Sequence, residues 1–302
     1  MDIVRYVSQS DGLPKVGVRR EGKLYAVDGV DQIADLMHLR ARKLLELLTS
    51  TRARLPVHGE VALLPPVDGE MEVWAAGVTY EMSRDARAEE SANAAVYELV
   101  YAAERPELFF KSTAWRVVTD GEPVGLRDDS LLNVPEPELG VFLNRWGEVV
   151  GFTACNDLSS RSIEGANPLY LPQAKVYAGS CAVAPTITPA WEIPDPGELM
   201  IDVTVWRETT PVWQASTSTA RMRRTLTELT SFLFNGENFP DGVLLLTGTG
   251  VVPAIDFTLS AGDRIDVCIE GVGRLSNVVA VGKQNFNWLD SARRSPACRV
   301  RS

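Results

Sequence analysis

Three acidic side chains and one lysine lie close together along the chain, between positions 136 and 175. Glu136 and Glu138 flank one proline, Asp157 follows in the next apolar run, and Lys175 comes after it. Alternate side chains of an extended segment share a face, so both glutamates can reach one cation and Asp157 can join from a neighbouring strand. Ligation by oxygen alone favours a hard divalent ion, Mg²⁺ first and Mn²⁺ or Ca²⁺ as substitutes. The spacing therefore predicts a metal site with a base beside it.

Two glutamates around a proline also occur as ordinary solvated residues at strand edges, and short motifs often match by chance. The surrounding blocks favour the metal site, because together they resemble the fumarylacetoacetate hydrolase superfamily over residues 70 to 285. The matching blocks, in chain order, are GVTY at 77–80, LFFKS at 108–112, PEPEL at 135–139, GFTACNDLSSR at 151–161, Lys175, and TGTG at 247–250.

The elements that must position these residues are mainly strands. Apolar and polar residues alternate at 201–205 and 265–269, and one helix, expected at 225–234, interrupts the strand-rich part of the chain that begins at Phe109. This order predicts an α+β fold, and the resemblance implies a mixed β-roll for the catalytic domain, residues 71–302.

Residues 1–70 are expected to form a small N-terminal α/β domain. Short strands are predicted near 4–7 and 23–27, followed by one helix at 31–48. A strand at 73–76 and a second helix ending near Ala103 should follow this domain.

Composition excludes several classes of protein. The 302 residues carry a formal net charge of −10, which argues against a nucleic-acid surface. The N-terminus lacks the apolar run of a signal peptide, and no apolar stretch is long enough for a membrane span. The four cysteines show no metal-binding spacing, and Cys155, Cys181 and Cys268 lie in apolar strand-like runs, as reduced thiols do. These features predict a cytoplasmic protein, and the arginines of the last ten residues are interpreted as a frayed, solvated tail.

One position departs from the hydrolases of the resembled family. Those that cleave carbon–carbon bonds have a histidine three positions after the tyrosine of the first block, where it activates water with a glutamate. Here Ser83 occupies that position, and the chain has only two histidines, His38 and His58. Neither is expected to act as the base that hydrolysis requires.

A bound metal could chelate a small 2-oxo acid and acidify the hydrogens at C3. Lys175 is then the expected base, and burial near a cation should depress its pKa. The alternative is an ordinary solvated lysine on a strand.

The segment 162–175 looks most like the branch of 2-keto-3-deoxy-D-arabinonate dehydratases. That resemblance implies loss of water from 2-dehydro-3-deoxy-D-arabinonate to give 2,5-dioxopentanoate, a step of pentose and sugar-acid degradation. Glu107 occupies the position where this branch has an acid that holds or protonates the leaving water. A plain helix-end glutamate after Pro106 is an equal alternative.

Five further positions match residues that line the pocket in the family, and they are predicted to bind substrate: Ser83, Lys111, Arg161, Glu164 and Thr249. Lys111, Arg161 and Glu164 could equally form ion pairs that orient the metal ligands. The family likeness further implies a homodimer or homotetramer. Two alternatives stay open, an acylpyruvate hydrolase or oxaloacetate decarboxylase of the same superfamily, and a non-catalytic metabolite-binding relative.

Overall fold

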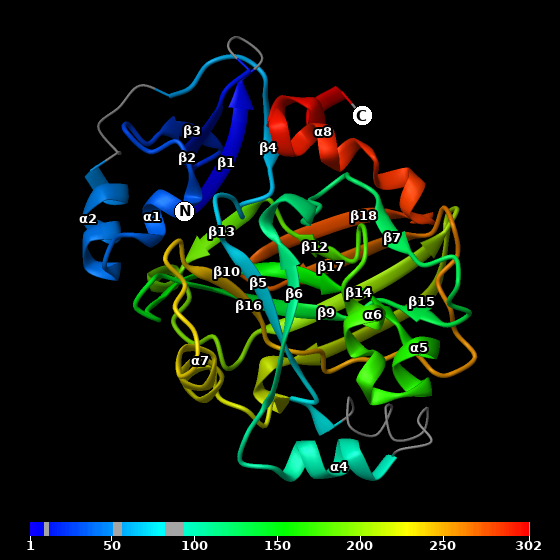
Figure 1. The fold of residues 1–302 in the computed structure, drawn as a ribbon. Helices are drawn as coiled ribbons and strands as arrows, with labels where there is room; N and C mark the ends of the chain where they lie inside the picture. Colours follow the sequence, from blue (N-terminus) through cyan, green and yellow to red (C-terminus); the bar gives the residue numbers. More distant parts are fainter. Residues whose placement is uncertain (9–11, 51–55, 82–93, 302) are drawn as a thin grey trace.

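The computed structural model describes residues 1–8, 12–50, 56–81 and 94–301. Within them the strands form one large sheet, a second sheet and a short pair (Figure 1). Across the large sheet the order is β3 (Lys23–Ala26), β2 (Pro14–Arg20), β1 (Asp2–Ser8), β13 (Thr186–Pro189), β10 (Val149–Asp157), β9 (Pro137–Leu143), β16 (Val243–Leu246), β5 (Glu72–Gly77) and β6 (Glu107–Thr113), with β4 (Val61–Leu64) on β1 and β12 (Cys181–Val183) on β10.

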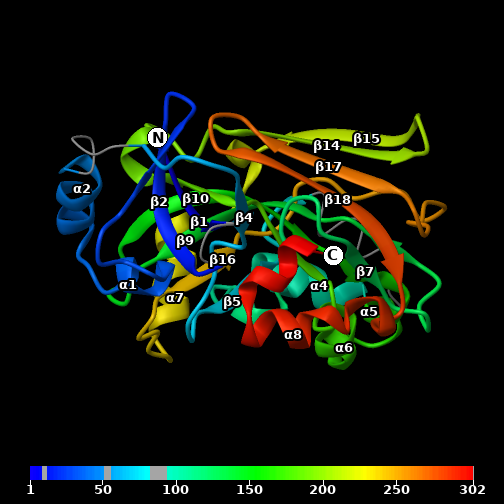
Figure 2. The same ribbon diagram turned by 90° about the horizontal axis from the view of Figure 1, so that it is seen from above.

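The second sheet lies over one face of the large sheet, as the view from above shows (Figure 2). Its order is β15 (Thr210–Ser218), β14 (Met200–Arg207), β17 (Arg264–Ile269), β18 (Gly273–Val281) and β7 (Val124–Leu126), and the short pair is β8 (Asn133–Val134) with β11 (Ser159–Ser160).

Helices cover the other face and the ends of the sheets. The α-helices are α1 (Ile33–Met37), α2 (Ala41–Ser50), α4 (Ala94–Ala102), α5 (Arg161–Ala166), α6 (Leu171–Lys175), α7 (Leu226–Phe234) and α8 (Trp288–Arg294). The 3-10 turns are η2 (Ala114–Arg116), η3 (Pro168–Tyr170), η4 (Ala190–Glu192), η5 (Thr219–Arg221), η6 (Lys283–Phe286) and η7 (Pro296–Arg301). This mixture of sheets and helices confirms the α+β prediction.

The large sheet separates two apolar cores because successive side chains of a strand point to opposite faces. Leu139 and Val141 of β9 pack towards the second sheet, together with Ile201 of β14. Phe142 belongs to the other core, where it joins Leu36 of α1. Glu138, an even number of positions from Phe142, therefore lies on the helix-covered face.

The predicted helix at 31–48 is in fact two helices, α1 and α2, with a break at residues 38–40. Tertiary contacts fix the second start: the Glu148 carboxylate accepts a hydrogen bond from the Ala41 N–H at 3.0 Å, and the Arg40 guanidinium lies 4.3 Å from the centre of the Trp146 ring. The periodicity of the sequence does not predict this break, because the contacting residues Trp146 and Glu148 lie about a hundred positions further along the chain.

The N-terminal strands continue the large sheet. Ile3 of β1 pairs with Ile187 of β13, and Leu36 and Leu44 share a core with Val73 and Phe142. The domain boundary placed between residues 70 and 71 stays a prediction.

The C-terminal segment packs against the body of the protein. The Arg299 guanidinium binds the Glu122 carboxylate at 2.8 Å and donates to the carbonyls of Trp115 and Val117. Its side chain is 7% exposed, so the interpretation of this arginine as part of a frayed tail is wrong. No helix in the described ranges is both long and apolar enough to cross a bilayer.

Candidate active site

One edge of the large sheet collects the chemically important strand ends. β5 and β16 are parallel, while β9 is antiparallel to both β16 and β10, and β6 is antiparallel to β5. The carboxyl ends of β5, β16 and β10 therefore meet the amino ends of β9 and β6 at the same edge. This arrangement brings together segments that are far apart in the sequence.

The three predicted metal ligands converge at that edge. Glu138 lies opposite Cys155 of β10, so Asp157, two positions further, points to the same face. Oxygen atoms of Glu136, Glu138 and Asp157 lie within 4.8 Å of one another, and all three side chains are buried. Backbone bonds keep the segments in register, since the Asp157 N–H donates to the Glu136 carbonyl at 2.9 Å.

Three buried cations surround these carboxylates. The Lys175 ammonium lies 2.7 Å from Glu136 and 3.1 Å from Asp157, and it donates to the Ser159 hydroxyl. The Arg161 guanidinium lies 2.9 Å from Glu136. The Lys111 ammonium forms an ion pair with Asp157. The charges balance, because three carboxylates face two ammonium groups and one guanidinium.

Glu138 stands apart within this cluster. Burial raises its pKa well above the usual value, and the neighbouring charges of Asp157 and Glu136 raise it further, while Lys175 and the Gly248 N–H act in the opposite direction. The hydrogen bond from that N–H is 2.6 Å long. A dication beside these oxygens would relieve the repulsion, so the donor set fits a hard metal ion.

Two unusual backbone conformations shape the wall next to Glu138. Val78, after β5, has a φ of 52°, and Gly248, after β16, has a φ of 91°. A side chain at 248 would meet the Thr79 hydroxyl, because a built Cβ lies 2.0 Å from that oxygen. The same hydroxyl donates to the Thr247 carbonyl at 2.7 Å and so ties the two loops together. Left-handed backbone at a β-branched residue is strained and commonly marks functional sites.

Glu107 begins β6 and pairs with Gly77 at the same edge. Its carboxylate lies over that glycine, since a Cβ built on Gly77 would be 2.0 Å from the Glu107 Oε2. Only a glycine at 77 leaves room for this carboxylate.

The other predicted substrate-binding residues take different positions. The Lys111 ammonium also donates to the carbonyls of Leu158 and Lys175, at 3.1 and 2.6 Å, so its contacts are with the protein. Glu164 is buried on α5, and the Thr249 hydroxyl donates to the Val251 carbonyl at 3.1 Å. Ser83 lies outside the described residues.

The sequence did not identify every residue of the site. Lys175 ends the helix α6 and is completely buried, so the alternative of a solvated lysine on a strand is wrong. Ser159, which contacts its ammonium, lies two positions after Asp157 in the NDLSS run, and that spacing was the available signal. Tyr80 closes the GVTY block and is buried beside Glu138, although it was not proposed as a site residue.

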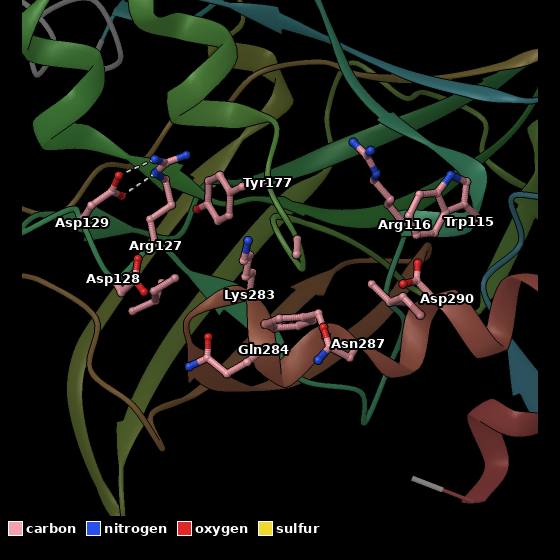
Figure 3. A pocket seen from close by; sticks show the side chains of 14 residues that line it. Trp115, Arg116, Arg127, Asp128, Asp129, Tyr177, Lys283, Gln284, Asn287 and Asp290 are labelled. Carbon is pink, nitrogen blue, oxygen red and sulfur yellow. Dashed lines mark hydrogen bonds and ion pairs between the residues drawn. The ribbon is translucent and has the colours of Figure 1, made fainter.

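A separate hollow of about 600 Å³ lies where the chain leaves α6, and Figure 3 shows the side chains that line it. It is lined by Tyr177, Arg127, Trp115 and residues of η6 and α8, and Arg127 is held there by Asp129. The Tyr177 ring also lies 5.9 Å from the Lys111 ammonium. None of the three clustered carboxylates lines this hollow.

Comparisons with known proteins agree with this geometry. The family model of the fumarylacetoacetate (FAA) hydrolase C-terminal domain matches residues 72–280. The probable 2-keto-3-deoxyxylonate dehydratase of Haloferax volcanii is 49% identical over 214 residues, 71% of this chain and 73% of that protein. The 2-dehydro-3-deoxy-D-arabinonate dehydratase of Saccharolobus solfataricus is 40% identical over 220 residues, 72% of this chain and 74% of that protein.

A solved structure of 2-keto-3-deoxy-D-arabinonate dehydratase, complexed with magnesium and 2,5-dioxopentanoate, has a similar fold. The TM-score is 0.79 at 31% identity, over 94% of this chain and 100% of that one. Since the family model spans well over half of the sequence and the relatives exceed 30% identity over most of it, the chain belongs to the fumarylacetoacetate hydrolase family.

Proposed function

We propose that this protein is a hydro-lyase that removes water from a 2-keto-3-deoxy sugar acid, with 2-dehydro-3-deoxy-D-arabinonate as the leading substrate and 2,5-dioxopentanoate as the product. The observation that carries the proposal is the buried cluster of Glu136, Glu138 and Asp157 with the Lys175 ammonium against it. The dehydratase names of the two relatives support the choice of reaction.

Glu136, Glu138 and Asp157 would hold Mg²⁺, with Mn²⁺ or Ca²⁺ as substitutes, because their oxygens are the ligands such ions prefer. When bound, the ion withdraws electron density from the 2-oxo group and makes the C3 hydrogens acidic. Arg161 and Lys111 orient two of these carboxylates through their ion pairs.

Lys175 is the proposed base, which takes a proton from C3 in its neutral amine form, and Glu107 is the proposed acid at the C4 hydroxyl. The C3–H bond and the C4–O bond break, the C3–C4 double bond forms, and the hydroxyl leaves as water with a proton from Glu107. Movement of the double bond to C4–C5, with a proton lost from C5 and one returned to C3, gives an enol. Loss of the C5 hydroxyl proton and addition of a proton at C4 then give the aldehyde. Thr249, Glu164 and Ser83 remain proposed substrate contacts.

A hydrolytic reaction would need a water-activating base, and the two histidines lie elsewhere. His38 pairs with Asp241 at 2.9 Å in the N-terminal region, and His58 is exposed. Position 83 is a serine in this chain, whereas the family's carbon–carbon hydrolases have a histidine there. Among the described residues, the site therefore has the groups for proton abstraction and no histidine that could activate water.

The experiment is a screen of 2-oxo acids with Mg²⁺, with products followed by mass spectrometry. We expect 2-dehydro-3-deoxy-pentonates to lose one water and acylpyruvates to stay almost unchanged. Cleavage of acetylpyruvate to pyruvate and acetate, without dehydration of the sugar acid, would establish the hydrolase alternative. Release of carbon dioxide from oxaloacetate alone would establish the decarboxylase alternative, and no turnover of any 2-oxo acid would indicate a binding protein.

The four cysteines are free thiols, which is consistent with a reducing cytoplasm as the proposed location. The proposed assembly is a homodimer or homotetramer, and light scattering of the purified protein would measure it.

A further inference from the structure

Tyr80 is the largest polar side chain of this edge that the proposed reaction leaves without a role. It is 1% exposed, and its hydroxyl has no hydrogen-bond partner among the described residues. A buried hydroxyl that lacks a partner costs about 1–3 kcal/mol, so such groups usually serve a ligand or a water molecule. The two residues before Tyr80 are Val78, with its left-handed backbone, and Thr79, which contacts the neighbouring loop.

The ring of Tyr80 is fixed by close packing. It lies against Gly250, since a Cβ built there would be 2.7 Å from the Tyr80 Cδ1 and 2.9 Å from its Cε1. The TGTG turn therefore clamps the ring and leaves little freedom to the hydroxyl. A phenol carries its proton at neutral pH, so the Tyr80 hydroxyl can act as a hydrogen-bond donor.

Tyr80 and Lys175 lie against different parts of the carboxylate cluster. Lys175 forms ion pairs with Glu136 and Asp157, whereas Glu138 accepts from the Gly248 N–H, in the same turn whose Gly250 packs against the Tyr80 ring. In a 2-oxo acid the carboxylate C1 and the reactive C3 are bonded to opposite sides of C2. If C3 faces Lys175, then C1 faces the Glu138 side, where the phenol donor lies.

We propose that the Tyr80 hydroxyl binds the carboxylate of the 2-oxo acid and so directs C3 towards Lys175. This assignment rests on the proposed function, because it takes the substrate class and the base from it. It makes Tyr80 a substrate-positioning residue, whose buried hydroxyl supplies a charge-assisted hydrogen bond. A 2-oxo acid of any tail length would use this contact, so it selects the class of substrate and leaves the tail to other residues.

Tyr80→Phe tests the assignment, because it removes one oxygen atom and leaves the ring packed on Gly250. Tyr25→Phe is the matched control, since Tyr25 lies on β3 in the N-terminal region. Pyruvate serves as the probe, because it carries the 2-oxo acid group without a leaving hydroxyl. Calorimetry measures binding of Mg²⁺ alone and then of pyruvate to the Mg²⁺-loaded full-length protein.

We expect Tyr80→Phe to bind Mg²⁺ like the parent and pyruvate about tenfold more weakly or worse, the loss typical of a hydrogen bond to a charged group. The thermal midpoint without ligand should be unchanged or higher, since the hydroxyl loses no partner within the protein. The tyrosine ultraviolet difference spectrum that pyruvate induces in the parent should also diminish in this variant. Tyr25→Phe should match the parent in all of these measurements.

Two outcomes would overturn the assignment and are distinguishable. If the parent and Tyr80→Phe bind pyruvate equally and give the same difference spectrum, the phenol does not contact the carboxylate, and the proposed function stands. If the parent loaded with Mg²⁺ does not bind pyruvate, the proposed function fails and the assignment fails with it. A Tyr80→Phe protein with a lowered thermal midpoint and normal pyruvate affinity would show a purely structural tyrosine.

Discussion

Glu138 differs from Glu136 and Asp157 in the groups that contact its carboxylate. Glu136 and Asp157 form ion pairs with buried cations, whereas the described contact of Glu138 is the backbone N–H of Gly248. Its charge is therefore the least compensated of the three. It is the position where a change of charge should affect the metal most and the fold least.

Replacement of Glu138 by glutamine should abolish Mg²⁺ binding and reduce turnover by more than about 100-fold, beyond the loss typical of residues that only orient a ligand. The amide oxygen can still accept from Gly248, so the thermal midpoint of the metal-free protein should not fall. Calorimetry, activity and thermal melts measure the three effects. Glu198→Gln on the exposed surface is the control, and full activity of Glu138→Gln after exhaustive chelation would exclude the metal site.

Lys175→Met should stop exchange of the C3 hydrogens of 2-oxobutanoate in heavy water, because the proposed base is gone. The change also leaves Glu136 and Asp157 without a shared ammonium, and an uncompensated buried charge costs about 3–5 kcal/mol. The metal-free variant should therefore melt earlier than the parent, and Mg²⁺ should stabilise it more. Exchange at the parental rate in this variant would assign the base to another residue.

The loops after β5 and β16 combine left-handed backbone, close packing on each other and a hydrogen bond to Glu138. Gly248→Ala should destabilise the protein by about 1–3 kcal/mol, because it forces a side chain into left-handed backbone. It should also weaken Mg²⁺ binding, since the Cβ displaces Thr79 and shifts the N–H that binds Glu138.

Gly22→Ala is the matched control for that variant. Gly22 has a φ of 74°, and a Cβ built there meets nothing within 4 Å, so this change isolates the backbone cost. Equal destabilisation by both substitutions, with unchanged Mg²⁺ affinity, would remove the role given to the Gly248 loop.

The contacts of Glu148 at the start of α2 predict that the stability of the protein depends on pH. Burial alone would raise the pKa of Glu148, but hydrogen bonds from the Ala41 N–H, Asn144 and Arg40 lower it overall. Folding therefore favours the charged form of Glu148. Its contribution to the free energy of unfolding is complete above the pKa of the unfolded state, and it disappears as the pH falls through the pKa of the folded state.

Glu148→Gln should therefore lower the free energy of unfolding by about 0.5–1 kcal/mol at neutral pH and by almost nothing in strong acid. The value is small because the carboxylate is partly exposed to solvent. Urea unfolding at several pH values measures it, with Glu198→Gln as the control. A destabilisation that is the same at all pH values would show that the charge of the Glu148 carboxylate does not stabilise the start of α2.

Residue alternation and capping motifs predicted those elements whose formation depends on residues close to one another in the sequence. Ile201, Val203 and Val205 alternate as buried residues on β14, and Thr225 caps α7 through the Glu228 N–H. The break between α1 and α2 and the helical position of Lys175 depend on partners far along the chain, which single-sequence periodicity does not encode. The carboxylate cluster was predictable because two ligands are two residues apart, the third lies in the adjacent strand, and the surrounding blocks resemble those of the family.

At the scale of the whole molecule, the N-terminal region and the site share one sheet. Because β1 pairs with β13 and the helices α1 and α2 share a core with β9 and β16, we expect one cooperative unfolding transition. Hydrogen exchange followed by mass spectrometry should give β1–β3 an opening free energy close to that of β9 and β10. Much earlier opening of residues 1–8 and 14–26 would instead support an independent domain that ends near residue 70.

The directions of the strands also bear on how this protein could change its specificity over evolutionary time. The carboxylate ligands belong to β9, β10 and the residue before β9, whereas Tyr80 and Thr249 belong to the loops after the parallel strands β5 and β16. The proposed metal ligands and the proposed substrate contacts thus belong to different segments of the sheet. A combinatorial library confined to residues 80–81 and 249–253, which keeps Thr79 and Gly248, should yield new substrate preferences while Mg²⁺ binding is retained.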